Sequence, residues 1–350
     1  MILSDLELHL VEISAAAATP RVRNLVVRLA TSGGYEGWGE APIDWQAEEL
    51  PGRRDALFLA LSGRSVFEIE DLLGLSILRH APLRAAVEMA SWDLVGRLAG
   101  QPLCHLFGGS YRRRVPVSVR VAGPTPRRVA ELARELAEQG FHGQTLACTG
   151  QLEQDLETLT AVRQMLPERT ELRLDGGACY DFDTAWELCS RLEGERIQFL
   201  LDPLRSFDLA QTASLRRQTS VPLAVGRPIR GPADVLAVLR CGAAPHVVID
   251  LRQVGGLAAA RRCAAVAQAG GLGASLACGP SLGVSLAAML QLAAATPAFS
   301  DRNECAPAHL QDHLLVEPLE ITEGLLPVPQ GPGLGIEIER ARLDRYPRAG

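Results

Sequence analysis

The chain has 350 residues, of which 47% are hydrophobic and 22% are charged, and its formal net charge at pH 7 is −6. This composition supports a large buried core, and the acidic balance argues against a nucleic-acid or anionic-membrane partner. All 35 basic residues are arginine, because the sequence contains no lysine. Schiff-base chemistry, a pyridoxal-phosphate linkage, a P-loop lysine and a lysine general base are therefore excluded.

The cysteines indicate the redox state of the compartment, and one long uncharged stretch raises the question of a membrane span. Eight cysteines occur singly, without C-x-x-C spacing, and the N-terminus has the pattern of a strand rather than of a secretion signal. We interpret the cysteines as buried thiols in a reducing cytoplasm. No charged residue occurs from Cys263 to Ser300, but glycines and Pro280 interrupt this stretch. It predicts a buried helix–strand–helix and not a membrane span.

The first part of the chain predicts an α+β domain. Two alternating stretches, Ile2–Ile13 and Arg23–Leu29, are followed by a turn and a third strand, which is typical of an antiparallel meander. Residues 46–108 are largely helical in pattern, and the amphipathic stretch Leu83–Ala99 ends at Gly100.

After residue 112, short apolar strands alternate with helices. The expected strands are Val115–Val121, Gln144–Cys148, Glu171–Leu174, Ile197–Leu201, Pro222–Val225, His246–Ile249 and Leu272–Leu276, with a last one near Phe299–Asn303. Alternation of this kind implies parallel strands joined by right-handed crossovers. Seven such units and a final strand predict an α/β fold, a (β/α)7β TIM-type barrel. We expect an N-terminal α+β capping domain over residues 1–112, the barrel over 113–322 and a segment over 323–350 that returns to the first domain.

Barrels of this kind carry their functional residues at the carboxyl ends of the strands. Polar or ionisable residues stand at that end of most strands here: Arg120, Thr145, Asp175, Asp202, Arg227, Asp250, Arg252, Cys278 and Glu304. Each one alone is explained as a structural polar group. Their shared position favours a functional site, because stability does not require charges there.

Several short motifs resemble a known family. They are Tyr35–Pro42 (YEGWGEAP), Arg84–Leu103, Leu106–Gly109, Leu172–Asp175, Asp202-Pro203, Gly255-Gly256 and Gly331–Gly335. In order and spacing they resemble the enolase superfamily, in particular its mandelate racemase/muconate lactonizing enzyme group, over nearly the whole chain. The resemblance implies isomerase or lyase chemistry of the muconate cycloisomerase type, in which a base removes the proton next to the carboxylate of a small substrate.

The resemblance also implies Mg²⁺, held by three carboxylates on strands three, four and five, to stabilise the enolate. Only the first ligand is matched, by Asp175. The strand-four position is Leu201, and the neighbouring Asp202 is expected to face the other way, since a shift of one residue turns a side chain to the opposite face. The strand-five position is Gly226 or Arg227. We therefore expect no cofactor, and no Mg²⁺ bound in the family manner.

The proton-transfer residues of the family are matched in part. The K-x-K pair on strand two falls on Thr145 and Ala147, so neither lysine is present. On strand six, Asp250 matches the aspartate form of the family's base, and its strand-seven partner falls near Cys278. The family's late glutamate corresponds to Glu304.

These matches favour an enzyme with altered chemistry. Arg227 would take the place of a metal ligand, pair with Asp175 and bind a substrate carboxylate in bidentate geometry. Asp250 is then the candidate base, with Cys278 as acid or thiolate partner and Glu304 as a further proton donor. The expected substrate-binding residues are Arg120, Arg252, Thr145 and Trp45. A guanidinium acidifies a carbon acid less than Mg²⁺ does, so elimination, hydration or isomerisation of an activated substrate is favoured over simple racemisation.

Two alternatives stay open. In one, the chain is a non-catalytic descendant that acts as a binding or assembly module, and its polar residues form structural ion pairs. In the other, which we give less weight, the family's metal-dependent cycloisomerase or racemase activity is retained. Capping loops over residues 15–21 and 42–46 that close on a ligand favour an enzyme. In each case we expect a small carboxylate ligand, a homo-oligomer, and no nucleic-acid or membrane partner.

Overall fold

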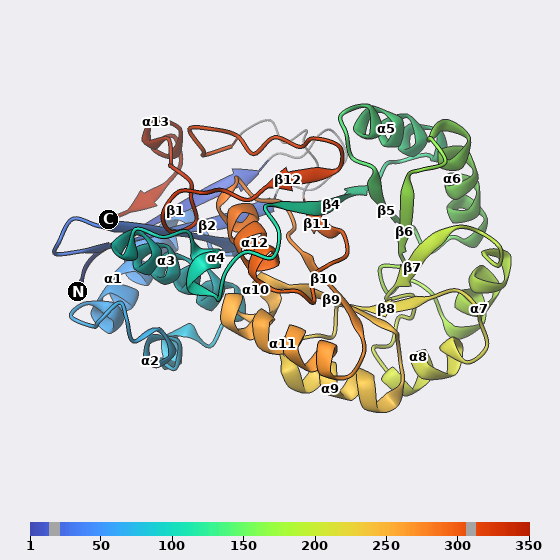
Figure 1. Cartoon of the computed structure of the whole chain (residues 1–350), viewed down its shortest axis with the longest axis horizontal. Coiled ribbons are helices and arrows are strands. Elements are labelled where there is room, and N and C mark those ends of the chain that lie inside the picture. Colours follow the sequence, from blue (N-terminus) through green and yellow to red (C-terminus); the bar gives the residue numbers. More distant parts are fainter. Residues whose placement is uncertain (14–21, 306–312) are drawn as a thin grey trace.

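The structure, a computed structural model, describes residues 1–13, 22–305 and 313–350, and it consists of a capping domain beside a barrel (Figure 1). Both chain termini lie in the capping domain. Its antiparallel sheet has the order β13-β1-β2-β3. The sheet strands are β1 (Leu3–Ile13), β2 (Val22–Thr31), β3 (Glu36–Pro42) and β13 (Arg348–Ala349). The helices of this domain are η1 (Ala47–Glu49), α1 (Leu50–Leu61), α2 (Ile69–Leu73), η2 (Ser76–Leu78), α3 (Ala81–Ala99) and α4 (Leu103–Leu106).

The second domain is the predicted (β/α)7β barrel. Its strands are β4 (Arg114–Val121), β5 (Gly143–Ala147), β6 (Glu171–Asp175), β7 (Ile197–Leu201), β8 (Leu223–Val225), β9 (His246–Asp250), β10 (Gly273–Ala277) and β11 (Asn303–Cys305). Each strand pairs in parallel with the next, and β11 closes the barrel on β4, with Glu304 opposite Ser118. The fold class expected from the strand–helix alternation is confirmed.

Helices cover the barrel, and two further short elements follow it. The helices are α5 (Pro126–Glu138), α6 (Leu152–Met165), α7 (Phe182–Arg191), α8 (Leu209–Arg216), α9 (Pro232–Cys241), α10 (Leu251–Val254), α11 (Leu257–Ala269) and α12 (Val284–Ala295). The later elements are β12 (Leu325–Pro327), which pairs antiparallel with β4, and α13 (Arg340–Leu343). In the described part of the chain, no helix is both long and apolar enough to cross a membrane.

The last barrel strand lies later in the sequence than we expected. It spans Asn303–Cys305, whereas the sequence pattern placed it near Phe299–Asn303. The Arg112 guanidinium explains the difference, because it donates to the main-chain oxygens of Ala293 (2.6 Å) and Phe299 (2.8 Å). The Ala293 carbonyl belongs to the last turn of α12, and that of Phe299 follows the helix, so the arginine bridges the two and the segment around Phe299 is a turn and not a strand.

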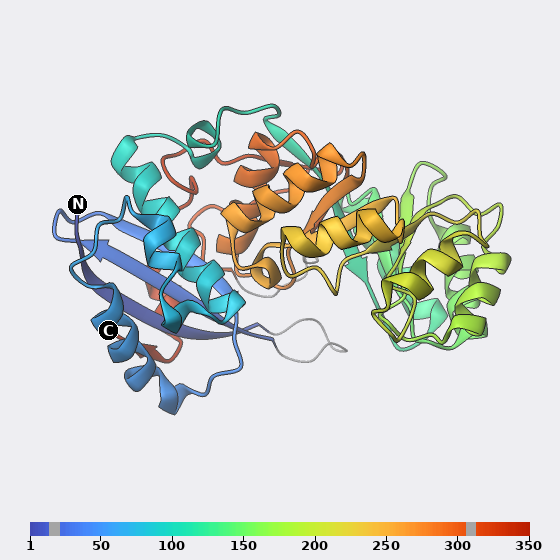
Figure 2. The ribbon, with the colours of Figure 1, turned by 90° about the horizontal axis from the view of Figure 1, so that it is seen from below.

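Glu40 of β3 fixes the capping domain to the barrel. It is fully buried, and its carboxylate accepts hydrogen bonds from Asn24 Nδ2 and the Leu282 amide, both at 2.7 Å. It also accepts from Ser281 Oγ (2.7 Å) and from the amides of Val284 and Ser285 (both 3.1 Å). These last two amides open α12, where free N–H groups and the helix dipole favour a negative charge. Figure 2 shows the capping domain against the orange helices of the barrel.

Two glycines of β3 allow this strand to pack closely against α3. A Cβ atom added at Gly39 would lie 1.8 Å from the Ala86 carbonyl oxygen, and one at Gly37 would lie 2.1 Å from that of Ala90. No other residue fits at either position without moving the helix. The Gly-Trp-Gly-Glu-Ala motif is thus explained by helix–sheet packing and by the docking carboxylate.

A second buried acid, Glu88 of α3, faces the start of α11. One of its oxygens accepts the Ala258 amide at 2.9 Å, and the other has no hydrogen-bond partner among the described residues. Burial raises the pKa of Glu88 to about 7, and the hydrogen bonds from the helix amides oppose this rise without cancelling it. The interface between the domains therefore contains a carboxyl group that titrates near neutrality.

Replacing Glu40 with alanine should lower the free energy of unfolding by about 3–5 kcal/mol, because several buried donors lose their acceptor at once. Urea denaturation followed by circular dichroism measures this change. Glu48→Ala, at an exposed position, is the control and should stay within about 0.5 kcal/mol of the wild type. A loss below about 1 kcal/mol for Glu40→Ala would contradict the docking role of this residue.

The pKa of Glu88 predicts a pH dependence of stability. Between its ordinary value of 4.5 and about 7, the folded state holds a proton that the unfolded state has released. The free energy of unfolding should therefore fall as the pH rises through this window, by up to about 1.4 kcal/mol per pH unit. Glu88→Gln, which mimics the protonated form, should remove this slope in urea titrations from pH 5 to 8. The exposed Glu68→Gln should keep the slope, and an equal slope in both variants would exclude Glu88 as its source.

Candidate active site

The residues expected at the carboxyl ends of the strands do lie at one end of the barrel. Neighbouring strands place them in register: Arg120 of β4 is opposite Thr145 of β5, and Asp175 of β6 is between Ala147 and Leu201. On the other side, Ala277 of β10 lies between Asp250 and Glu304. These register partners come from all strands of the barrel except β8, which ends just before Arg227.

Asp175 is the centre of a cluster with two arginines. Its Oδ1 accepts from Arg227 Nη1 (3.1 Å) and the Gly177 amide (2.8 Å), and its Oδ2 accepts from Arg120 Nη1 and Arg227 Nη2 (3.4 Å). Burial favours the neutral acid, but the two guanidinium groups outweigh it and hold the pKa of Asp175 below its ordinary range. The side chains of Arg120 and Arg227 are 38% and 37% exposed, whereas that of Asp175 is buried. Two cations thus share one anion and face the solvent side.

Asp202 lies in this cluster, although the sequence pattern had placed it on the opposite face. Its φ is +43°, so the chain leaves the extended conformation directly after β7 and the alternation of side chains stops there. Its carboxylate accepts the amides of Gly226 (3.0 Å) and Arg227 (2.7 Å) and lies 3.8 Å from Arg227 Nη1. Burial raises its pKa to about 6. The sequence shows only an aspartate before Pro203 at this point, and alternation alone misses the change of backbone conformation.

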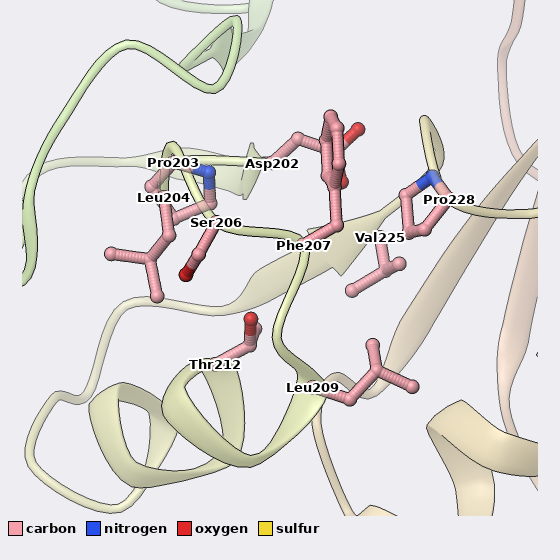
Figure 3. Close-up of a pocket in the computed structure, with 9 residues that line it drawn as sticks. All are labelled: Asp202, Pro203, Leu204, Ser206, Phe207, Leu209, Thr212, Val225 and Pro228. Carbon is pink, nitrogen blue, oxygen red and sulfur yellow. The ribbon is translucent and has the colours of Figure 1, made fainter.

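A small pocket adjoins Asp202. It has a volume of about 10 Å³, which is room for about one water molecule, and it is lined mainly by apolar side chains of the loop after β7, of α8 and of the segment around Pro228. Figure 3 shows Asp202, Phe207, Val225 and Pro228 around it. Asp202 therefore lies between this pocket and the arginine cluster.

The opposite side of the barrel mouth contains a second ion pair. Asp250 accepts from Arg252 Nε (2.9 Å), Nη2 (2.6 Å) and the amide of the same residue (2.9 Å), which makes it the N-cap of α10. Burial raises the pKa of Asp250, but the Arg252 cation and these hydrogen bonds bring it below the ordinary value. Asp250 is consequently ionised at neutral pH.

Glu304 and Cys278 differ from Asp250 in the direction of their pKa shifts. Burial raises the pKa of Glu304, while Arg120 and a polar contact with Thr145 oppose the rise. Burial also raises the pKa of Cys278 to about 12, so this thiol is protonated at neutral pH and is not a thiolate. Glu304 therefore keeps its proton to a higher pH than an ordinary glutamic acid does.

The floor of the mouth is apolar. Leu201, at the position where the resemblance implies a glutamate, packs with Phe199, Ala224 and Val248 inside the barrel. The polar residues lie around this patch, at the ends of β4, β5 and β6, directly after β7 and β8, and in the row from β9 to β11. Such a site offers cations to one part of a ligand and an apolar surface to another part.

Trp45, which we expected to bind the substrate, lies away from the barrel mouth, in the core of the capping domain. Trp45 is 8% exposed and packs in the core of the capping domain, with the Arg53 guanidinium 5.0 Å above its ring. The loop over residues 15–21, which we expected to close over a ligand, lies outside the described residues.

A divalent metal ion does not fit these side chains as they stand. Both oxygens of Asp175 already accept hydrogen bonds from guanidinium or amide groups, and Leu201 offers no ligand atom. Among the described residues, no group of three histidine, cysteine, aspartate or glutamate side chains is arranged to hold a metal ion. Mg²⁺ requires oxygen ligands in octahedral geometry, and here cations occupy the space around the one matched carboxylate.

Replacement of Asp175 by asparagine should leave two guanidinium groups facing each other without their anion. We expect the free energy of unfolding to fall by about 1–3 kcal/mol. The value should lie toward the lower end of this range if solvent screens the two partly exposed arginines well. Adding Arg227→Ala should restore part of this loss, because it removes the repulsion. Urea denaturation of both single variants and the double variant measures the coupling. Simple additivity would show that the cluster is not energetically connected.

Comparisons with known proteins agree with this architecture. A family model described as the mandelate racemase/muconate lactonizing enzyme N-terminal domain matches residues 7–108. One described as enolase C-terminal domain-like matches residues 128–342. Muconate cycloisomerase 1 from Rhodococcus opacus is 29% identical over 343 residues, covering 93% of this chain and 91% of that protein.

Two further relatives extend the comparison. N-succinylamino acid racemase from Thermus thermophilus is 28% identical over 325 residues, covering 89% of this chain and 86% of that protein. The crystal structure of 2-chloromuconate cycloisomerase from Rhodococcus opacus superposes with a TM-score of 0.89 at 24% identity, covering 99% of each chain. This last likeness concerns the fold.

Proposed function

Because the chain belongs to the mandelate racemase/muconate lactonizing enzyme family, we propose that it is an isomerase or lyase that acts on a small carboxylate without a bound metal ion. The observation that carries this proposal is the pairing of Arg120 and Arg227 around Asp175. Both guanidinium groups contact Asp175 and are still more than a third exposed, so a ligand can reach them from the barrel mouth. Guanidinium groups bind carboxylates in bidentate geometry, and a small carboxylate is the ligand that this pair of arginines suits.

The apolar floor and the relatives narrow the substrate class. Muconate and N-succinylamino acids, the compounds in the names of the two relatives, are carboxylates with a carbon skeleton next to the charged group. In this chain the arginines would bind the carboxylate, while Leu201 would contact the adjoining carbon atoms. The proposed substrate is therefore a carboxylate with an apolar body.

Two carboxyl groups with opposite pKa shifts supply the proton transfers. Asp250 has a lowered pKa and is the base that takes the proton next to the substrate carboxylate, and Glu304, with a raised pKa, is the donor. Both flank Ala277 in register, so their Cα atoms are two strand spacings, about 10 Å, apart with a small side chain between them. Arg120 and Arg227 would stabilise the charge that develops on the substrate carboxylate.

Arg252 limits the strength of this base. Its two hydrogen bonds to Asp250 lower the affinity of the carboxylate for a proton, which is why an activated substrate is required. Cys278 adjoins this pair as a neutral thiol and is a possible additional donor. The proposed reaction is accordingly an elimination, hydration or isomerisation and not the racemisation of a simple carboxylate.

A non-catalytic protein is the alternative, and one observation favours it. The carboxylates of Asp175 and Asp250 both have arginine partners in the structure, as expected if the former site had become a set of structural ion pairs. In that case carboxylates bind without turnover. The family's Mg²⁺-dependent reaction would in turn require the arginines to leave Asp175.

Proton exchange in D₂O separates these possibilities. Muconate, whose C–H groups next to the carboxylates are vinylic, is incubated with the protein and its conversion is followed by NMR. N-succinylamino acids are incubated in the same way, and the loss of their α C–H signal is followed. We expect exchange or turnover that EDTA does not reduce, and a loss of roughly 100-fold or more in Arg227→Ala and Asp250→Asn. Arg217→Ala, at an exposed arginine that follows α8 as its C-cap, is the control.

The other outcomes are equally distinct. Activity that EDTA abolishes and Mg²⁺ restores would overturn the metal-free proposal. Binding of the carboxylates without exchange or turnover would favour the non-catalytic protein.

A further inference from the structure

The loop that carries Arg227 is held from both sides. On one side, the buried carboxylate of Asp202 accepts the amides of Gly226 and Arg227, at 3.0 and 2.7 Å. On the other side, the Gln253 amide nitrogen donates to the carbonyl oxygens of Gly226 (3.2 Å), Arg227 (3.0 Å) and Ile229 (2.6 Å). The loop therefore has its amide groups bound by Asp202, directly after β7, and its carbonyl groups bound by Gln253 of α10.

These contacts control where the Arg227 guanidinium points. The side chain of an arginine has four rotatable bonds, so its direction is set by the main chain from which it starts and by the charges that it meets. Asp202 supplies both constraints, since its Oδ2 accepts the Arg227 amide and lies 3.8 Å from Nη1 of the same residue. The guanidinium then continues to Asp175, where it makes two hydrogen bonds.

The backbone of Asp202 is strained in the same place. A φ of +43° is uncommon for a residue other than glycine and has an energetic cost that the surrounding contacts must offset. Burial also raises its pKa to about 6, with Arg227 and Asp175 as the facing charges. Strain and a buried charge at one residue are typical of a position that is kept for function.

We propose that Asp202 and Gln253 are positioning residues for Arg227, and that they hold its loop so that the guanidinium meets the carboxylate of a ligand. This role rests on the proposed function, in which Arg227 binds that carboxylate. Neither residue touches the ligand. Asp202 acts through the amides and the charge of Arg227, and Gln253 acts only through the carbonyl groups.

The two residues make a test possible in which charge and geometry are separated. Asp202→Asn keeps one oxygen as a hydrogen-bond acceptor but removes the charge, whereas Asp202→Ala removes both. Gln253→Ala removes the hydrogen bonds to the carbonyl groups of the loop without changing any charge. Asp208→Asn is the matched control, because Asp208 lies on the same loop and caps α8 through the Ala210 amide (2.8 Å) without contacting Arg227. Thermal melting by circular dichroism selects the variants that remain folded.

The readouts are the affinity for muconate by calorimetry at pH 8 and the modification rate of Arg227 by phenylglyoxal, followed by peptide mass spectrometry. We expect roughly tenfold weaker binding or more in Asp202→Asn and Gln253→Ala, with the largest loss in Asp202→Ala. Arg227 should react several-fold faster in all three variants, and Asp208→Asn should match the wild type in both measurements.

Two outcomes separate this inference from the function on which it rests. If the wild type binds muconate and neither Asp202→Asn nor Gln253→Ala changes the affinity or the reactivity of Arg227, the positioning role is wrong. If the wild type does not bind muconate or N-succinylamino acids but Arg227 becomes more reactive in both variants, the positioning role holds and the proposed function fails.

Discussion

The burial of one carboxylate, that of Glu40, determines how the two domains meet. A charge removed from water needs several hydrogen-bond donors, and here they come from β2, from the segment before α12 and from the first turn of that helix. These hydrogen bonds favour one orientation of the capping domain on the barrel. This docking contact lies close in the chain to the barrel mouth, because α12 follows β10, the strand that carries Ala277 between Asp250 and Glu304.

The mouth itself is organised by cations where the related enzymes are expected to hold a metal ion. Arg120 and Arg227 neutralise Asp175, and Leu201 turns the adjoining floor apolar. A guanidinium differs from a divalent ion in carrying a single delocalised charge and a fixed set of donors, so it orients a carboxylate well and acidifies a neighbouring C–H bond weakly. The proposal of an activated substrate rests on this difference and on Arg252, which lowers the pKa of the proposed base, Asp250.

The sequence patterns were reliable wherever the backbone is regular. The alternation of strands and helices correctly predicted the barrel. The charge-free stretch after Cys263 forms the end of α11, then β10 and α12, as its pattern predicted. The prediction failed where one side chain changes the local backbone. Arg112 donates to the carbonyl groups around Phe299, and β11 therefore begins later in the chain than expected. The left-handed backbone at Asp202 ends the alternation of side chains that would have turned its carboxylate away from Arg227. Neither effect is visible in a pattern of apolar residues.

The sequence by itself determined the fold class, the absence of any lysine chemistry and the set of polar residues at the ends of the strands, because these depend on local periodicity and on composition. Only the tertiary structure decided which charges pair. Asp175 and Arg227 are 52 positions apart, and their contact exists because the barrel brings β6 and the end of β8 to the same rim. The same holds for Glu40 and α12. Long-range pairing of this kind follows from closure of the barrel and docking of the cap, which no local segment encodes.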